Sequence, residues 1–212
     1  MTKITTVLFD FDGVITNTEP QYHTYFDNAA QKYKLGIDNF GIAVQGMTFP
    51  DVLTKYFANF SQKDIDQFTL DTAEFERQLH YPPVKGAIEF IQYLKANNYK
   101  IGLVTSSQDF KMQIALKKME LNGIFDTEVT ANRITKGKPD PMCYQLAAQD
   151  LGATPEECIV FEDAIAGIKA ASSANIRVIG VSTTMPEDTL EELVYEVIPD
   201  FSDPELILSY FN

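Results

Sequence analysis

The sequence has few cysteines and few basic residues. Its two cysteines, Cys143 and Cys158, form neither a CxxC pair nor a disulfide framework. Cys158 lies in an apolar run, so we expect a small buried side chain there. The chain has 17 Lys and Arg residues against 30 Asp and Glu residues, a formal net charge of -13. Nucleic-acid-binding proteins hold phosphate backbones with basic patches, so this charge balance argues against that class.

The sequence also lacks a long apolar run. No stretch approaches the roughly 20 apolar residues of a membrane-spanning helix, and Asp10 interrupts the first apolar run too early for a signal peptide. The 212 residues are 45% hydrophobic, enough for one large domain or for one domain that carries an insertion. We therefore expect a globular, cytoplasmic protein that binds neither nucleic acid nor membrane.

Short β-branched runs alternate with helical patterns along most of the chain. The expected strands are Thr5–Phe9, Lys100–Thr105, Asp126–Thr130, Cys158–Phe161, Arg177–Val181 and Val197–Ile198. The expected helices between them are Ala87–Ala96, Asp109–Met119, Pro141–Leu151 and Ala164–Ala171. This alternation predicts an α/β fold with a parallel sheet and helices on both faces. In such a sheet the carboxyl ends of several strands meet at one edge, where ligands bind.

One segment, from about residue 16 to residue 81, interrupts this alternation. It contains no convincing strand, and its helical patterns cover Tyr22–Lys34, Pro50–Phe60 and Lys63–Leu79. Thr48 is expected to be the N-cap of the second of these helices, with Pro50 at the first helical position. We interpret the segment as a helical insertion that returns to the sheet near Val84; the alternative is that these helices belong to the body of the domain.

Two aspartates, Asp10 and Asp12, follow the first strand and are followed by Gly13. In an extended chain the side chains of residues i and i+2 point to the same side, so the two carboxylates converge. Such a pair needs a cation or a shared proton. Mg2+ is commonly held by one or two carboxylates together with phosphate oxygens. Alone, this pattern is a weak signal and is more typical of a solvated turn.

Three further groups of polar residues follow other strands or begin helices. They are the hydroxyl run Thr105-Ser106-Ser107, the lysine Lys138 before a proline, and the acid pair Glu162-Asp163. Each has an ordinary explanation: a helix N-cap, a solvated charge and a complement to a helix dipole. Together at one sheet edge, they instead predict a site for an anion and a dication.

This ordered set of motifs resembles the haloacid dehalogenase (HAD) superfamily, and within it the β-phosphoglucomutase-like phosphatases with a small helical cap. The resemblance rests on Asp10-Phe11-Asp12-Gly13-Val14, Thr105-Ser106-Ser107, Lys138-Pro139 and Glu162-Asp163. It implies a three-layer, Rossmann-like α/β core formed by residues 1–15 and 84–212. It also implies an inserted α-helical cap, residues 16–83, that sets substrate specificity.

The resemblance implies a two-step phosphoryl transfer with Mg2+ as cofactor. Asp10 would be the nucleophile that forms an aspartyl-phosphate, and Asp12 the general acid and then the general base. The metal would be bound by Asp10, the backbone carbonyl of Asp12 and the acid pair Glu162-Asp163, with Glu162 direct or through water. The residues expected to hold the phosphate and the rest of the substrate are Thr105, Ser106, Ser107, Lys138, Tyr22 and Phe49.

Departures from the family pattern favour a phosphatase of a small phosphorylated metabolite over a sugar-phosphate mutase. Tyr22 stands where mutases carry a histidine, and Phe49 where they carry an arginine for the second phosphate. Asn17 stands where an aspartate is common, a change without an interpretation. A haloacid dehalogenase is disfavoured by Asp12, and a two-component receiver by motif order and length. A binding protein without turnover is a further alternative. Neither the substrate nor the oligomeric state follows from the sequence.

Overall fold

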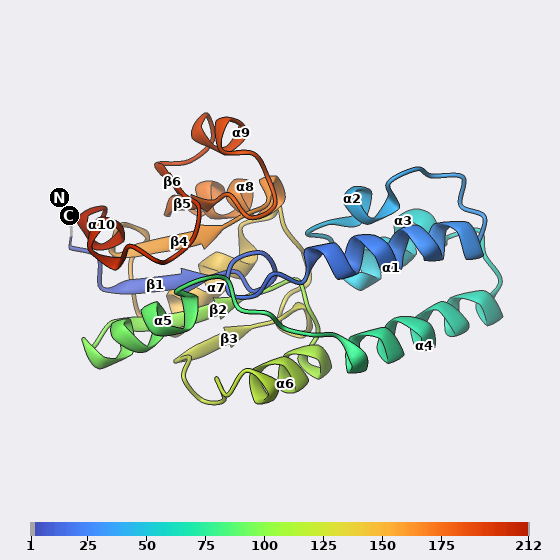
Figure 1. Ribbon diagram of the computed structural model, residues 1–212, viewed down its shortest axis with the longest axis horizontal. Coiled ribbons are helices and arrows are strands. Elements are labelled where there is room, and N and C mark those ends of the chain that lie inside the picture. Colours follow the sequence, from blue (N-terminus) through green and yellow to red (C-terminus); the bar gives the residue numbers. More distant parts are fainter. Residues whose placement is uncertain (1–2, 212) are drawn as a thin grey trace.

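The computed structural model describes residues 3–211, and its centre is one sheet of six parallel strands (Figure 1). The strands are β1 (Thr6–Phe9), β2 (Lys100–Val104), β3 (Thr127–Val129), β4 (Cys158–Glu162), β5 (Arg177–Val181) and β6 (Glu196–Ile198). Their order in the sheet is β3-β2-β1-β4-β5-β6. Because β1 pairs with β2 on one side and with β4 on the other, its carboxyl end lies at the middle of the sheet edge.

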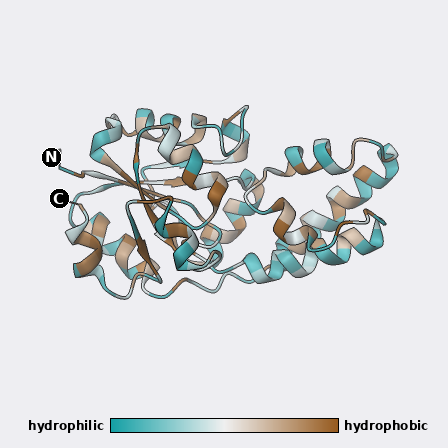
Figure 2. Cartoon of the chain, turned by 90° about the horizontal axis from the view of Figure 1, so that it is seen from above, coloured by the Kyte–Doolittle hydropathy of each residue, from teal (hydrophilic) through white to brown (hydrophobic). Residues whose placement is uncertain are grey.

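Helices cover both faces of the sheet, because alternate residues of each buried strand point to opposite faces. Val7 and Phe9 of β1 join an apolar cluster with α5 (Ala87–Ala96), α6 (Asp109–Lys118) and α10 (Pro204–Ser209). Leu8 joins a second cluster with α7 (Met142–Asp150), α8 (Ile165–Ser173) and α9 (Glu187–Glu191). In Figure 2 the strands carry the hydrophobic colours between these helices. The predicted three-layer α/β core is confirmed.

Four helices lie between β1 and α5 and form a second lobe beside the sheet (Figure 1). They are α1 (Glu19–Lys32), α2 (Phe40–Val44), α3 (Phe49–Tyr56) and α4 (Gln62–Gln78). Their buried side chains, such as Phe26, Phe57 and Phe68, form an apolar cluster of their own. Thr48 is the N-cap of α3, since its side chain accepts a hydrogen bond from the Asp51 backbone. Pro50, however, is the second residue of that helix and not the first.

The remaining differences from the sequence prediction concern helix ends and short elements: α1 begins at Glu19 and not at Tyr22, and α3 ends at Tyr56 and not at Phe60. The five- and six-residue helices α2, α9 and α10 were not expected, because one or two turns carry too little periodicity to be recognised. The same holds for two 3-10 turns, η1 (Ala131–Arg133) and η2 (Pro155–Glu157). Cys158 is buried, as expected. Among residues 3–211, no helix is both long enough and apolar enough to cross a membrane.

Candidate functional site

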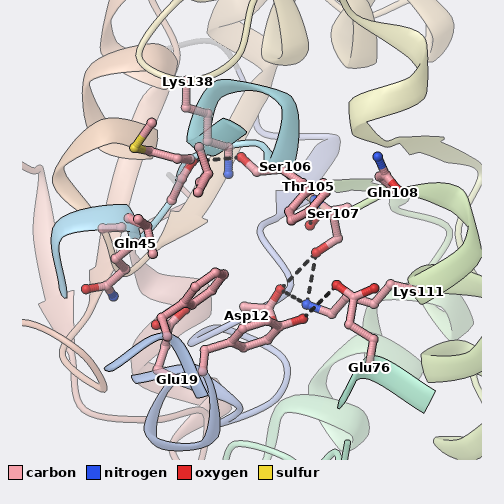
Figure 3. A pocket seen from close by; sticks show the side chains of 18 of the residues that line it. Asp12, Glu19, Gln45, Glu76, Thr105, Ser106, Ser107, Gln108, Lys111 and Lys138 are labelled. Atoms are coloured by element: carbon pink, nitrogen blue, oxygen red, sulfur yellow. Dashed lines mark hydrogen bonds and ion pairs between the residues drawn. The ribbon is translucent and has the colours of Figure 1, made fainter. Parts of the chain in front are cut away.

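The carboxyl ends of three neighbouring strands meet at the middle of the sheet edge. Asp10 follows β1, Thr105 follows β2, and Glu162 ends β4. The strand order reverses between β1 and β4, which is where open α/β sheets bind their ligands. One pocket lies between this edge and the α1–α4 lobe (Figure 3). All ten residues singled out in the sequence line it: Asp10, Asp12, Tyr22, Phe49, Thr105, Ser106, Ser107, Lys138, Glu162 and Asp163.

Lys138 is a buried cation held between two buried carboxylates. Its Nζ donates to Asp10 Oδ1 at 2.8 Å and to Glu162 Oε1 at 2.5 Å. Burial alone would lower the pKa of Lys138, but the two ion pairs outweigh burial and raise it. Lys138 is therefore a fixed positive charge beside Asp10, and not a solvated surface lysine.

Glu162 is fully buried, and both of its carboxylate oxygens are already occupied. Oε1 accepts from Lys138 and from the Tyr144 hydroxyl at 2.7 Å, and Oε2 accepts from the backbone amides of Asp163 and Ala164. A Cβ atom on Gly167 would overlap this carboxylate, so α8 approaches it closely only because a glycine is there. The main effect of this arrangement is to orient Lys138.

Asp163 is also buried, but one of its oxygens is much less constrained than those of Glu162. Its Oδ2 accepts a hydrogen bond from Thr184, which follows β5. Gly13 lies against the same carboxylate with φ of +81°, and a side chain there would clash with Asp163. The glycine after the two aspartates is therefore required both for its backbone conformation and for the approach of Asp163.

Three carboxylates are gathered here around a single lysine. Oxygen atoms of Asp10, Glu162 and Asp163 lie within 4.8 Å of one another, an arrangement that could hold a metal ion. Burial, opposed by Lys138 and reinforced by repulsion from Glu162, raises the pKa of Asp10 to about 7. Burial and repulsion from Glu162 and Asp10 likewise raise the pKa of Asp163. Three carboxylates and one ammonium leave two excess negative charges, which is the charge that one divalent cation balances.

Asp12 also lines the pocket and has its own set of donors. Its Oδ1 accepts from the Thr18 hydroxyl, and its Oδ2 accepts from Ser107 Oγ at 3.1 Å and Lys111 Nζ at 2.5 Å (Figure 3). Ser107 therefore contacts Asp12 and is not the N-cap of α6, a position that Gln108 occupies.

The neighbouring hydroxyl residues hold the loop after β2 in place. The Thr105 hydroxyl accepts from the Ser107 backbone amide at 3.1 Å, and the Ser106 hydroxyl donates to the Gly46 carbonyl at 3.0 Å. Gly46 belongs to the loop between α2 and α3, so Ser106 links the sheet edge to the helical lobe directly over the pocket.

The helical lobe supplies the opposite wall of the pocket. The Tyr22 hydroxyl donates to Glu76 at 3.2 Å, and Phe49 packs on Phe68 with 5.5 Å between ring centroids. Both predicted side chains therefore face the pocket and also pack within the lobe. Glu19 lies on this wall as well, and the His23 Nε2 atom is 3.5 Å from its Oε2. Burial and repulsion from Asp12 raise the pKa of Glu19 to about 8.

Sequence analysis missed several residues of this pocket. Lys111 carried a usable signal: it lies four residues after Ser107 and four before the buried Ala115, so helical spacing places it on the inner face of α6. Glu76 on the lobe wall and Thr184, which contacts Asp163, carried no such signal, because only the folding of distant segments brings them to the site.

Comparison with known proteins places this arrangement among enzymes. A family model described as haloacid dehalogenase-like hydrolase matches residues 7–181. Hexitol phosphatase A of Escherichia coli is 32% identical over 192 residues, which cover 86% of this chain and 84% of that protein. The phosphorylated carbohydrates phosphatase of Thermotoga maritima is 30% identical over 181 residues, covering 82% and 84%. A crystal structure of β-phosphoglucomutase from Clostridium difficile superposes with a TM-score of 0.81 at 26% identity, covering 99% of this chain and 97% of that one.

Proposed function

The chain belongs to the haloacid dehalogenase-like hydrolases, and we propose that it is a Mg2+-dependent phosphatase of a small, sugar-phosphate-like phosphomonoester. The observation that carries this proposal is the meeting of Asp10, Asp163 and Lys138 at one sheet edge, with Asp12 lining the same pocket. The named activities of the two phosphatase relatives support the choice of substrate class.

The buried carboxylates fit the proposed metal ion, because burial and mutual repulsion raise the pKa values of Asp10 and Asp163, and a bound dication would stabilise their ionised forms. Asp10, Asp163 and the backbone carbonyl of Asp12 would hold it, and Glu162 would act mainly by orienting Lys138. When bound, Mg2+ would neutralise charge on the transferring phosphoryl group.

The proposed reaction has two steps, carried by two aspartates. In the first, an oxygen of Asp10 bonds to phosphorus, the bond from phosphorus to the leaving oxygen breaks, and Asp12 gives that oxygen a proton. In the second, Asp12 takes a proton from water, the water oxygen bonds to phosphorus, and the bond to Asp10 breaks. Asp12 thereby regains the proton that it gave up, and inorganic phosphate leaves.

The other pocket residues would bind and orient the substrate. Lys138 offers a fixed positive charge, and the hydroxyl and amide groups of Thr105, Ser106 and Ser107 offer donors to the phosphoryl oxygens. Tyr22 and Phe49 would contact the remainder of the substrate. We also propose that residues 1–15 and 84–212 form the catalytic core and residues 16–83 the specificity cap. A cytoplasmic location remains a prediction.

The proposed function is tested by phosphate release from a panel of sugar and polyol phosphates, in Mg2+ and in EDTA. We expect release that requires Mg2+ and that Asp10→Asn lowers by at least about 10³-fold. The exposed Asp188→Asn, on α9, is the matched control and should behave as wild type. Absence of release from every substrate by a well-folded wild type would contradict the proposal.

The same assay separates a phosphatase from a mutase. A mutase would convert β-glucose 1-phosphate to glucose 6-phosphate without net release of phosphate. Phe49 supplies no positive charge for a second phosphate group, and neither do Glu19 and Glu76 on the nearby wall. We therefore expect phosphate release to exceed any isomerisation. The opposite ratio would favour the mutase, consistent with the similarity to β-phosphoglucomutase.

A further inference from the structure

Lys111 is a buried lysine that lines the pocket. Only 1% of the residue is exposed, although it carries a positive charge. Its Nζ donates to Asp12 Oδ2 at 2.5 Å and to Ser107 Oγ at 2.9 Å, and Ser107 donates to the same Asp12 oxygen (Figure 3). The three groups form a closed triangle on one oxygen of the proposed acid and base.

The helical lobe holds the lysine in this position from the other side. The Tyr22 ring lies under Nζ at 4.5 Å, and Tyr22 is fixed in turn by its hydrogen bond to Glu76. The Phe11 ring is 5.8 Å away. Aromatic faces attract a desolvated ammonium group, so Lys111 is restrained both by the core and by the lobe.

Fold stability alone does not explain a lysine at this position. α6 already has a second lysine for docking the lobe, because Lys118 donates to the carbonyls of Arg77 and Leu79 at the end of α4. The helix is apolar around position 111 on its inner face, at Met112 and Ala115. A buried ion pair is seldom more stabilising than a hydrophobic residue of similar size. Fold stability therefore does not account for a charged residue at position 111, and a role in the pocket is the alternative.

Lys111 is the one cation within ion-pair distance of Asp12 among residues 3–211. With Thr18 on the other oxygen, the Asp12 carboxyl group is held at both ends, which fixes its rotation. A general acid must be placed within a few tenths of an ångström of its target, and misplacement by about 1 Å can cost about 10²-fold in rate.

We propose that Lys111 is a positioning residue for Asp12, and that it thereby controls protonation of the leaving oxygen. This inference rests on the proposed function. The ammonium group holds Asp12 toward the pocket and adds positive charge where negative charge develops on the departing oxygen. Because Tyr22 lies against Lys111, the helical lobe contributes to holding the acid in place.

The test compares two substrates that differ in their need for a proton. A hexitol or hexose phosphate leaves as a strongly basic alkoxide and requires the acid, whereas p-nitrophenyl phosphate leaves as a stable phenolate and does not. For both substrates, kcat/KM reports on the steps up to phosphorylation of Asp10. The ratio of the two kcat/KM values of one variant is independent of the fraction of enzyme that is folded, so partial unfolding cannot imitate the effect.

We expect Lys111→Met to lower kcat/KM for the alkyl phosphate by about 10²-fold, and that for the aryl phosphate by less than about threefold. Lys111→Arg, which keeps the charge, should recover part of the loss for the alkyl phosphate. Lys118→Met is the matched control: it removes a lysine of the same helix that contacts the lobe but not Asp12. It should leave the ratio unchanged.

Equal losses for both substrates in Lys111→Met would overturn the inference, since they would indicate a general structural role. A changed ratio in Lys118→Met would also overturn it, because loosening of the lobe would then explain the effect. Failure of the proposed function is separate. It would appear as a wild type that hydrolyses neither substrate, or as hydrolysis that persists in Asp10→Asn.

Discussion

Single buried charges determine most of the chemistry of this pocket. Glu162 is saturated with donors and orients Lys138, whereas Glu19 has no hydrogen bond among the described residues and faces the pocket. Two glutamates of the same chain are therefore suited to different tasks. The partners of each carboxylate, more than its distance from Asp10, indicate whether it can meet a substrate.

The raised pKa of Glu19 makes the stability of the metal-free protein depend on pH. Burial and Asp12 raise this pKa to about 8 from 4.5, so between these values the folded protein keeps a proton that the unfolded chain releases. The free energy of unfolding should therefore fall as pH rises from about 5 to 8. Thermal melting in EDTA at about pH 5 and at about pH 8 measures this decrease in stability.

The control for this pH effect is a pair of substitutions. Glu19→Gln should make the melting temperature less dependent on pH, because the group no longer titrates. Glu89→Gln, at an exposed position of α5, should keep the wild-type dependence. An unchanged slope in Glu19→Gln would show that other groups are responsible.

At the scale of elements, α4 has two separate roles: its N-terminal cap stabilises the helix, and its last turns contribute to the pocket wall. Its 17 residues begin after the N-cap Ser61, whose side chain accepts from the Asp64 backbone, and its last turns carry Glu76 to the pocket. At about 1.5 Å per residue, Ser61 lies roughly 20 Å from Glu76 along the helix. The N-terminal end of α4 should therefore affect stability but not catalysis.

Ser61→Ala tests this separation. Loss of the N-cap leaves the Asp64 amide without its side-chain partner, which should cost about 1 kcal/mol and lower the melting temperature by about 2–4 °C. Turnover of a sugar phosphate should be unchanged. Ser61→Thr, which keeps a hydroxyl that accepts from the Asp64 amide and donates to the Asp64 carboxylate, should restore stability. A loss of turnover in Ser61→Ala would mean that the far end of α4 is coupled to the pocket.

At the scale of the whole molecule, the proposed metal ion couples the site to global stability. Asp10 follows β1 and Asp163 follows β4, two adjacent central strands that the unfolded chain does not keep together. An ion that binds only the folded form raises the free energy of unfolding by about 2.7 kcal/mol at one hundred times its dissociation constant. The central sheet should therefore be more stable with the metal bound.

Thermal melting with and without Mg2+ measures this coupling. We expect saturating Mg2+ to raise the melting temperature of the wild type by about 5–10 °C relative to EDTA. Asp163→Asn should remove most of this shift, because a neutral amide is a weaker ligand for a hard cation. The exposed Asp188→Asn should keep it. A full shift in Asp163→Asn would place the ion elsewhere.

Much of the fold was predictable from local patterns. The strand and helix runs of the core, the interruption between β1 and α5, and the N-cap Thr48 each depend on neighbouring residues. The convergence of Asp10, Thr105 and Asp163 was predictable for a similar reason, since carboxyl ends of parallel strands share one edge. The short helices α2, α9 and α10 were not, because they are stabilised by packing and not by a local pattern.

The sequence by itself determined the residue types at the sheet edge and the order in which the chain delivers them. Only the tertiary structure decided how the charges pair. Lys138 lies between Asp10 and Glu162, while Lys111 holds Asp12, and these partners are 24 to 128 residues apart in the chain. Pairing of buried charges depends on three-dimensional distance and on exclusion of water, and neither is encoded in local spacing.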